Sequence, residues 1–585
     1  MNETRTYYIG LGATFHDPAL ALVGPGGEVL FAEAAERPLQ SKRALNCPPD
    51  ALDRVAALLQ DHCADAQGFV VARNWRKRRP GYERLAALLG WLTPEGLRFR
   101  SGRRLHTWLE GPELHHMLAC QRQALGRAGL DLARVLRRDF PAVPVRFRYY
   151  DHHLTHAALA CYGSPFEEAA CAVLDAYGEE GSLAFFAYRD GRLTPCGAAR
   201  GPQSLGLFYM KLTELCGFHW LKGEEWKVMG LAAHGQTDPQ LLGWLRAMVR
   251  LEGLGLATCY PVFFDHLRRL ERHRRRPEQA PESAADLAHT GQRFFVETVT
   301  ALLTRFHALG LSEHLALGGG CALNSACNGL LLAQTPFRSL YVPPAPADDG
   351  TALGAALLAF HDDHPGRHGA PRLLSPYLGS RMGDHAVERY ARYGGLAVRR
   401  FPDGGVEAAA AELLAAGKIL GWVQGRAEFG PRALGNRSIL ADPRRPELGK
   451  RLTTEVKFRE PFRPYAPAIL HEFGPAYFEG YQEAPYMERA LPFRPEARGR
   501  VPAVVHVDGT GRLQTVKREW NPRFHALLTE FHRRTDVPVL LNTSFNVMGK
   551  PMVHSVEDAF AVFLGSGLDA LVIGDTLFSK PGSCP

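Results

Sequence analysis

Two histidines and one aspartate are the first residues of this chain whose types and spacing could hold a metal ion. His152 and His156 lie four residues apart in HLTHAALACY, a segment of helical composition, so both imidazoles project from one helix face. Asp175 ends the apolar run Ala169–Leu174 and precedes a tight turn, which is typical of a buried strand. Two nitrogens and a carboxylate suit Fe(II), Zn or Mn. The alternative is that the HxxxH spacing arose by chance.

Glycine-rich turns and acidic pairs add further candidates. HLALGGGCALN runs from an apolar strand through Gly318, Gly319 and Gly320 to Asn324 and an apolar helix. Such a turn lets backbone N–H groups approach an anion at a helix N-terminus, although a plain packing turn remains the alternative because no GKS/T or GxGxxG is present. Before the next helix, PPAPADDG supplies Asp348 and Asp349, either as a helix cap or as a fourth metal ligand.

LKGEEWKVMGLAAHG offers another contact for a polar ligand. Glu225 and Lys227 lie there beside a small-residue turn that leads towards a helix. This signal is weak by itself.

Cations accumulate in the last third of the chain, among glycines and prolines. These residues do not form a solvated helix face. They are therefore interpreted as rigidly held cationic side chains that converge on phosphate, with hydroxyl and amide groups as neutral partners. A merely structural origin is the alternative. The segments are GWVQGRAEFGPRALGNRSILAD with Arg426, Arg432 and Arg437, KFREPFR from Lys457 to Arg463, QTVKREWNPR with Arg518 and Arg523, and LLNTSFNVMGK with Thr543, Ser544 and Asn546.

A repeated pattern of strands predicts how these residues are positioned. Strands are expected at Tyr7–Leu11, Ala19–Val23 and Glu28–Ala32, and the same strand–turn order recurs from Ala169–Leu174 onward. The repeat indicates two related α/β halves that face a common cleft, which would make His16, in the first polar turn, a neighbour of Asp175. Chance hairpins are the alternative.

The remaining segments set the expected domain limits. Residues 50–147 read as a mostly helical insertion with Trp75, Trp91 and Trp108, and they identify no ligand. The composition changes around His361–Gly383, so domains are expected at 1–370 and 371–585.

Composition restricts the class of protein. The 585 residues contain no stretch of about 18 uncharged apolar residues, and the first residues do not read as a secretion signal. Eleven scattered cysteines without CxxC pairs favour reduced thiols, so a cytoplasmic protein without membrane contact is expected. The net charge of +8 is modest, and the basic clusters are interpreted as solvated surface, with nucleic acid or an anionic ligand as the minority interpretation.

The ordered motifs resemble the O-carbamoyltransferases of nodulation-factor and antibiotic biosynthesis. The resemblance runs through FHDPALALV, HHLTHA, VLDAYGE, EEWKVMGLA, GGGCALN, DDGTALGAAL, EFGPRALGNRSILADP, KFREPFRPYAP and LLNTSFN, nearly the whole chain. It implies an actin-like ATPase domain similar to TsaD, followed by a smaller domain similar to YrdC. AEAAER stands where the family commonly has EEER.

The family's site residues map onto this sequence motif by motif. The resemblance implies metal ligation, usually of iron, by His152, His156, Asp175 and Asp348, and it places His16 next to the acceptor. It also implies that Arg432, Lys457, Arg463 and Arg518 bind carbamoyl phosphate, with Ser544 and Asn546 in an SxN position. We assign the catalytic roles to His16, Arg432 and Lys457, and nucleotide contacts to Lys227, Gly319, Gly320 and Asn324.

The implied reaction joins carbamoyl phosphate to Mg²⁺-ATP, with release of pyrophosphate, and then transfers the carbamoyl group to a small hydroxylated natural product. Three other classes stay open: a tRNA threonylcarbamoyl-type enzyme, a non-catalytic actin-like regulator that binds nucleotide, and a simple metallohydrolase. Nucleic acid is not expected as a partner, and a homodimer is left open. Neither the acceptor nor the metal can be named from the sequence.

Overall fold

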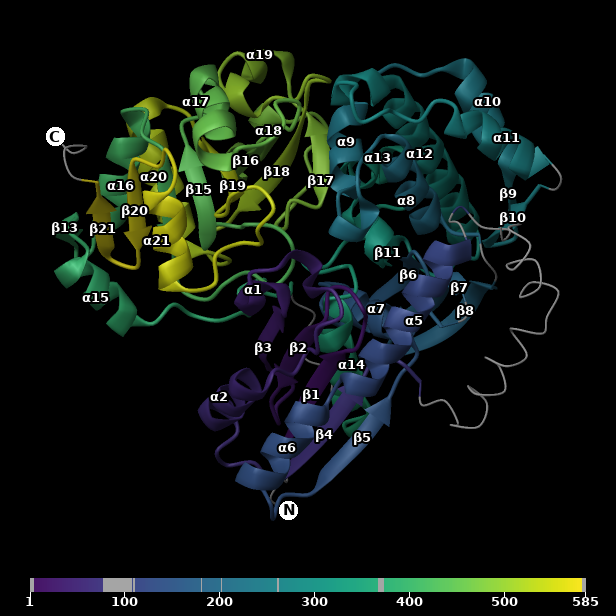
Figure 1. Cartoon of the computed structure of the whole chain (residues 1–585), viewed down its shortest axis with the longest axis horizontal. Helices are drawn as coiled ribbons and strands as arrows, with labels where there is room; N and C mark the ends of the chain where they lie inside the picture. The colour runs from purple at the N-terminus through teal and green to yellow at the C-terminus, as the bar shows by residue number, and fades with distance from the viewer. Residues whose placement is uncertain are drawn as a thin grey trace.

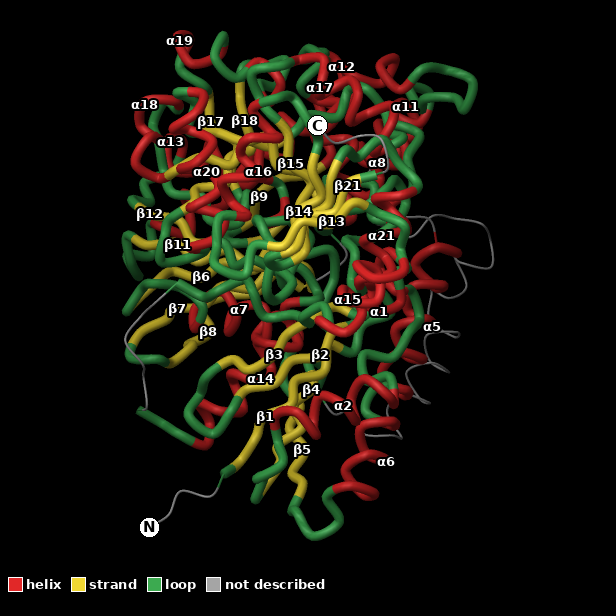
Figure 2. The backbone as a smooth tube through the Cα atoms, turned by 90° about the vertical axis from the view of Figure 1, so that its left-hand side faces the viewer, coloured by secondary structure: helices red, strands yellow, loops and turns green. Residues whose placement is uncertain are grey.

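The computed structural model describes residues 5–76, 108, 111–179, 181–200, 203–259, 262–366 and 373–580. Trp91 and the expected domain limit at 370/371 lie outside the described residues. We call residues 5–366 the amino-terminal part and residues 373–580 the carboxyl-terminal part. Figures 1 and 2 show the first sheet at the lower end of the molecule and the large sheet of the carboxyl-terminal part at the upper end.

The first sheet has five strands in the order β3-β2-β1-β4-β5. Strands β1 (Thr6–Gly12), β2 (Ala19–Val23) and β3 (Val29–Ala34) form an antiparallel meander, with Gly12 paired to Ala19 and Ala19 paired to Ala34. Strands β4 (Gly68–Arg73) and β5 (Val145–Tyr149) add to β1 in parallel. The carboxyl ends of β1 and β4 therefore lie at the same edge of the sheet.

This sheet corrects one expectation. Residues 50–147 were predicted to be a mostly helical insertion, but β4 and the first part of β5 lie in that range and belong to the core sheet. They were missed because short apolar runs between helices do not show strand periodicity clearly. Among the described residues of this range, the helices are α2 (Leu52–His62), α5 (Gly111–Arg127) and α6 (Leu130–Asp139).

The second sheet repeats the first. Its order is β12-β11-β6-β7-β8, with an antiparallel meander of three strands and two parallel additions. The predicted duplication of an α/β unit is therefore confirmed. The strands are β6 (Glu168–Leu174), β7 (Gly181–Arg189), β8 (Arg192–Arg200), β11 (His314–Gly318) and β12 (Ser339–Tyr341).

Two buried helices join the two sheets. Helix α14 (Gly350–Asp363) packs on β1 and β2, helix α7 (His152–Tyr162) packs on β6 and β11, and the two helices contact each other. The contact is very close, because a Cβ at Gly354 would lie 1.9 Å from the carbonyl oxygen of Thr155. A run of small residues in α14 therefore fixes the distance between the halves.

Further helices and one hairpin surround the second sheet. They are α8 (Leu205–Leu215), α9 (Glu225–Ala232), α10 (Pro239–Met248), β9 (Val249–Glu252), β10 (Gly255–Thr258), α11 (Val262–Glu271), α12 (Ala285–His307) and α13 (Ser325–Gln334). The short helix α1 (Glu36–Leu39) follows β3. Within the described ranges, no helix is both long and apolar enough to span a bilayer.

The carboxyl-terminal part is built on one mixed sheet of nine strands, in the order β13-β21-β20-β14-β15-β19-β16-β18-β17. The strands are β13 (Ala397–Arg400), β14 (Leu420–Val423), β15 (Arg437–Ala441), β16 (Ala466–Leu470), β17 (Arg489–Pro492), β18 (Thr510–Val516), β19 (Val539–Ser544), β20 (Ala570–Ile573) and β21 (Thr576–Ser579). The helices are α15 (Asp384–Tyr393), α16 (Val406–Ala415), α17 (Pro446–Arg451), α18 (Gly474–Tyr477), α19 (Pro495–Arg498), α20 (Pro522–Thr535) and α21 (Val556–Leu564).

The α7–α14 contact predicts opposite effects for two glycine-to-alanine changes in helices. Gly354→Ala should lower the thermal midpoint, at a cost of about 1–3 kcal/mol, because its Cβ has no room. Gly243→Ala in α10 should raise it, by about 0.5–1 kcal/mol, because no atom lies within 4 Å of that Cβ. Scanning calorimetry compares the two variants, and equal midpoints would contradict the packing.

Candidate active site

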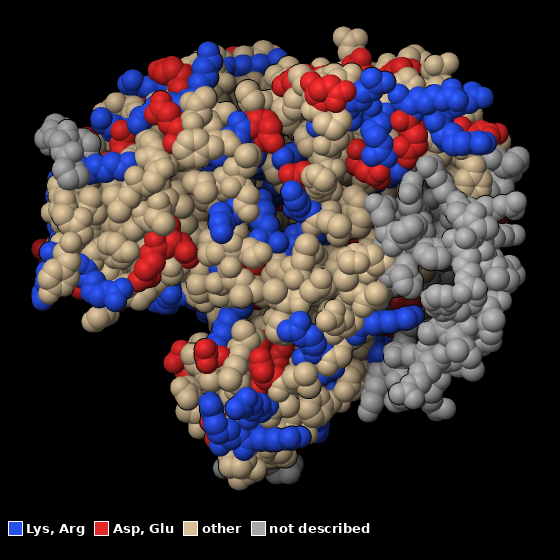
Figure 3. All heavy atoms as spheres, in the orientation of Figure 1, with Lys and Arg blue, Asp and Glu red and all other residues tan. Residues whose placement is uncertain are grey.

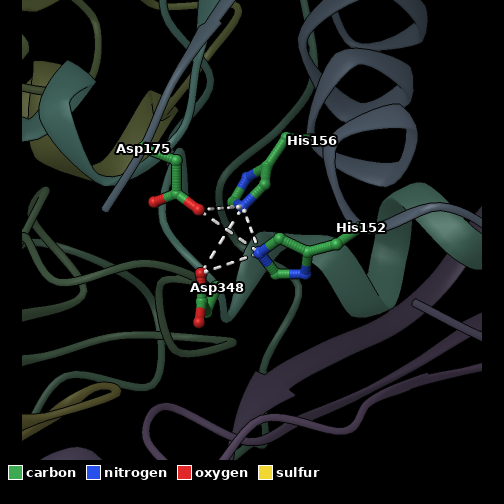
Figure 4. Close-up of side chains that lie close together, drawn as sticks. All are labelled: His152, His156, Asp175 and Asp348. Atoms are coloured by element: carbon green, nitrogen blue, oxygen red, sulfur yellow. Dashed lines mark hydrogen bonds and ion pairs between the residues drawn. The ribbon is translucent and has the colours of Figure 1, made fainter. Parts of the chain in front are cut away.

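Four side chains of the amino-terminal part converge on one buried point (Figure 4). His152, His156, Asp175 and Asp348 each offer one ligand atom, and these four atoms all lie within 4.8 Å of one another. The Nε2 atoms of the two histidines are 3.3 Å apart. Asp348 Oδ1 lies 3.5 Å from His152 Nε2 and 3.4 Å from His156 Nε2.

Local structure explains why these side chains meet. The side chain of Asp151 accepts a hydrogen bond from the backbone N–H of Leu154 and so begins α7 just before His152. Asp175 follows directly after β6, and Asp348 precedes α14. The α7–α14 contact then brings the three segments to one place.

The two neighbouring aspartates have separate tasks. Asp348 faces the two histidines, whereas the side chain of Asp349 accepts from the N–H of Gly350 and caps α14. Burial, together with the charges of Asp17, Glu36 and Asp348, raises the pKa of Asp349 to about 8. The structure thus places Asp348 in the His/Asp cluster and Asp349 at the cap of α14.

The donor set fits a divalent ion. Ligand bonds of about 2.0–2.2 Å place neighbouring ligands about 3–3.5 Å apart, and the contacts of Asp348 have this spacing. Burial would lower the pKa of His152, but Asp348 and Asp175 raise it to about 10. Two buried carboxylates thus favour positive charge at this point, which is what a metal ion would supply.

His16 lies beside this cluster. Its Nδ1 is 2.9 Å from Asp17 Oδ2, 3.1 Å from Arg43 Nη2 and 3.6 Å from Asp348 Oδ2. Burial would raise the pKa of Asp17, but Arg43 and the hydrogen bond with His16 lower it. The ionised carboxylate can therefore accept from Nδ1–H, which leaves the lone pair of Nε2 available as a base.

Lys457 of the carboxyl-terminal part holds a second group of polar residues in place. Lys457 Nζ donates to the carbonyl oxygens of Ser544 (2.6 Å) and Asn546 (3.0 Å), and Ser544 Oγ donates to Asn546 Oδ1 (2.8 Å). Lys457 ends a π-helical turn, Leu452–Lys457, of a kind that is frequent at functional sites. Burial and the nearby cations Arg459 and Arg463 lower the pKa of Lys457 well below its ordinary value.

Two arginines near this lysine have no counter-charge. Within the described part of the chain, the side chains of Arg432 and Arg512 form neither a hydrogen bond nor an ion pair. Burial lowers the pKa of Arg432 to about 10, and burial with Arg432 and Arg459 lowers the pKa of Arg512. Cations that lie close to one another in a partly desolvated place favour an anionic ligand.

The His/Asp cluster with His16, and the basic residues around Lys457, open into one cavity of about 730 Å³. Its wall includes His16, Asp175 and Asp348 of the amino-terminal part and Arg432, Lys457 and Arg512 of the carboxyl-terminal part. Figure 3 shows a hollow between the two upper lobes with basic side chains gathered in it. The two sites predicted from the sequence are therefore two regions of one space.

Most of the other predicted residues also line this cavity, and several have protein partners as well. Lys227 Nζ lies 2.6 Å from Glu460 Oε1, and Arg463 stacks on Trp226 at 3.6 Å. The N–H of Gly320 donates to Asp175 Oδ1 (3.2 Å), and the positive φ of Gly319 permits this turn. Thr543, Ser544, Asn546 and Asn324 complete the set, although the Asn324 side chain is used to cap α13.

Two residues that were predicted to bind substrate do not line this cavity. Arg518 is exposed on the loop after β18 and does not line the cavity. Arg523 lies in α20, where it forms ion pairs with Glu407 and Asp575. The chain leaves the sheet at Val516, before both residues, and the arginine of this segment that lines the cavity is Arg512 in β18.

Sequence reasoning also missed Arg43 and Arg512. Arg43 follows the first meander and has a positive φ of 60°, as Asp17 has one of 54°. Such backbone strain clusters at functional sites but leaves no mark in the sequence of a non-glycine residue. An arginine inside the apolar alternation of β18 was a detectable signal for Arg512.

Known proteins match this chain over both parts. Residues 128–357 match the family model described as Carbamoyltransferase N-terminus, and residues 411–580 match Carbamoyltransferase C-terminus. An uncharacterised Synechocystis protein, sll1178, is 32% identical over 98% of this chain and 97% of its own length. Nodulation protein NolNO of Sinorhizobium fredii is 38% identical over 76% of this chain and 65% of its own length. Full-length HypF covers 62% of this chain and 46% of its own at a TM-score of 0.37 and 11% identity.

The duplicated α/β fold and the two family matches together define a group-transfer enzyme. The chain belongs to the carbamoyltransferase family.

The neighbouring aspartates provide a matched test of the metal cluster. Asp348→Asn should lower the affinity for a divalent transition metal by about 10–100-fold, because one charged ligand is lost. Asp349→Asn should leave it unchanged, because asparagine also caps helices well. Competition with a metal indicator measures both affinities, and an equal loss in the two variants would contradict the assignment.

Proposed function

We propose that this chain is an ATP-dependent O-carbamoyltransferase that activates carbamoyl phosphate as carbamoyl adenylate and transfers the carbamoyl group to a hydroxyl of a small acceptor. One observation carries the proposal most directly: arginines without counter-charge share a cavity with a His/Asp cluster and a histidine. The first group suits polyanionic donors, and the second suits acyl-type transfer to an alcohol.

The carboxyl-terminal part would form the activated donor. Arg432, Arg512 and Lys457 would bind the phosphates of carbamoyl phosphate and Mg²⁺-ATP and stabilise the charge that develops during phosphoryl transfer. Atom balance requires one water. The phosphate of carbamoyl phosphate leaves as inorganic phosphate, the carbamate oxygen then attacks the α-phosphorus of ATP, and pyrophosphate leaves.

The amino-terminal part would carry out the transfer. His16 Nε2 would take the proton of the acceptor hydroxyl while Asp17 holds Nδ1–H. The hydroxyl oxygen attacks the carbamoyl carbon, and AMP leaves. A divalent metal bound by His152, His156, Asp175 and Asp348, with Fe(II) as the first candidate, would supply Lewis-acid stabilisation of oxygen charge.

The acceptor is proposed only as a class. The cavity of about 730 Å³ has room for the adenylate together with a small hydroxylated molecule. A natural product is the kind of acceptor that the sequence resemblance implies.

The donor reaction can be tested without an acceptor. With ATP, carbamoyl phosphate and Mg²⁺, the protein should release pyrophosphate and inorganic phosphate in equal amounts. Lys457→Met and Arg512→Met should each lower pyrophosphate release by about 100-fold or more, because each loses a cation that faces the phosphates.

Arg518→Met is the matched control for Arg512→Met. It removes an exposed arginine six positions along the same segment and should keep the wild-type rate. Loss of activity in Arg518→Met with retention in Arg512→Met would restore the sequence-based assignment and refute the structural one.

The proposed role of His16 as the base can be tested because donor activation and carbamoyl transfer are measured separately. With a hydroxylated acceptor that the wild type carbamoylates, His16→Gln should lower transfer by about 100–10,000-fold while pyrophosphate is still formed in the first turnover. Quenched-flow analysis of pyrophosphate and carbamoylated product measures both steps. Wild-type transfer in His16→Gln would exclude the general-base role.

A further inference from the structure

Asn74 occupies a buried position between the catalytic histidine's loop and the metal cluster. It follows directly after β4 and is fully buried. Its Oδ1 accepts from the backbone N–H of Ala13 (2.8 Å), and its Nδ2 donates to Thr351 Oγ1 (2.8 Å). Nδ2 also lies 3.4 Å from Nδ1 of His152.

Each contact of Asn74 leads to a different part of the site. Ala13 begins the loop that carries His16. Thr351 Oγ1 donates to the carbonyl oxygen of Asp348 at 2.5 Å, so this hydroxyl connects Asn74 to the Asp348 loop. The next residue, Trp75, stacks on the ring of His152 with centroids 5.0 Å apart and an interplanar angle of 29°.

The amide is the group that this position needs. A donor and an acceptor on one short side chain satisfy Ala13 N–H and Thr351 Oγ1 at the same time. An apolar side chain of similar size would leave the buried N–H of Ala13 unpaired, which costs about 1–3 kcal/mol. Such a cost would be relieved by movement of the loop or of the ligands.

We propose that Asn74 is a positioning residue that fixes His152 and the Asp348 loop relative to the loop that carries His16. Trp75 stacks on the face of the His152 ring, and Asn74 packs against its edge. The hydrogen bonds through Thr351 connect Asn74 to the Asp348 loop. The inference rests on the metal cluster of the proposed function and deepens it. It also gives a role to the Asn-Trp segment after β4, to which the sequence assigned no ligand.

A second amide, which is half-buried, provides a matched control. Gln121 of α5 holds the same loop, because its Oε1 accepts from the N–H of Phe15 (3.0 Å) and its Nε2 donates to the carbonyl oxygen of Ala13 (2.9 Å). Among the described residues, Gln121 forms no hydrogen bond with a member of the His/Asp cluster. Gln121→Leu therefore disturbs the loop alone.

The test is Co²⁺ titration of the full chain, followed by the visible spectrum of the bound ion. Asn74→Leu should bind Co²⁺ about 10–100-fold more weakly than the wild type and with a shifted spectrum, as is usual when a ligand loses its outer partner. Gln121→Leu should bind with wild-type affinity and spectrum. Both variants should still release pyrophosphate, which shows that the chain is folded.

A conservative variant keeps the test decisive if Asn74→Leu does not fold. Thr351→Val keeps the side-chain volume but removes the hydroxyl that accepts from Asn74 and donates to the carbonyl oxygen of Asp348, so Co²⁺ should bind more weakly than to the wild type. Wild-type Co²⁺ binding in Thr351→Val would overturn the proposal.

Hydrogen exchange tests the connection to the loop. At saturating Co²⁺, amide exchange in residues 13–17 should slow in the wild type and in Gln121→Leu, but not in Asn74→Leu. Unchanged Co²⁺ binding in Asn74→Leu, or an equal loss in Gln121→Leu, would overturn this inference alone. Failure of the wild type to bind Co²⁺ would instead refute the metal cluster of the proposed function, and this inference with it.

Discussion

The contact between α7 and α14 is the constraint on which the rest of the amino-terminal part depends. Because Gly354 lies against the backbone of Thr155, the two helices approach more closely than side chains would allow. One helix carries His152 and His156, and the other follows Asp348, so the distance between the helices sets the distance between the ligands. The duplicated sheets hold these helices from both sides and bring Asp175 to the same point.

The charged residues of the carboxyl-terminal part are balanced differently from those of the His/Asp cluster. The His/Asp cluster contains both imidazoles and carboxylates, whereas Arg432 and Arg512 face the cavity with no carboxylate partner among the described residues. Half-buried cations that lie close to one another favour an anionic ligand. These are the residues that would bind phosphates.

The sequence predicted those features that depend on residues close together in the chain. The HxxxH pair, the strand that ends at Asp175 and the repeated meander were all readable, because each is a local pattern of period four or two. The direction of the side chains around β18 was not readable, so the resemblance pointed to Arg518, whereas Arg512 is the arginine of this segment that lines the cavity. Motif resemblance found Lys457 and Ser544 because they are fixed by the family's sequence rather than by local periodicity.

Contacts between residues that are far apart in the chain could not be predicted from the sequence. The partners of Asn74 are separated from it by 61 and 277 residues, and no pattern along the chain connects them. Strands β4 and β5 were hidden for a related reason, since their place in the sheet comes from pairing with β1 and with each other. Chemistry could be predicted from residue types, but the positions of the supporting residues required the fold.

The central claim is that donor activation and transfer share one cavity, so the activated donor stays bound between the steps. The most direct measurement mixes the protein with ¹⁴C-carbamoyl phosphate, ATP and Mg²⁺ in the absence of acceptor and passes the mixture rapidly through a desalting column. The account predicts that labelled carbamoyl adenylate elutes with the protein, at up to one equivalent per chain. Labelled adenylate found wholly in the small-molecule fraction would contradict it.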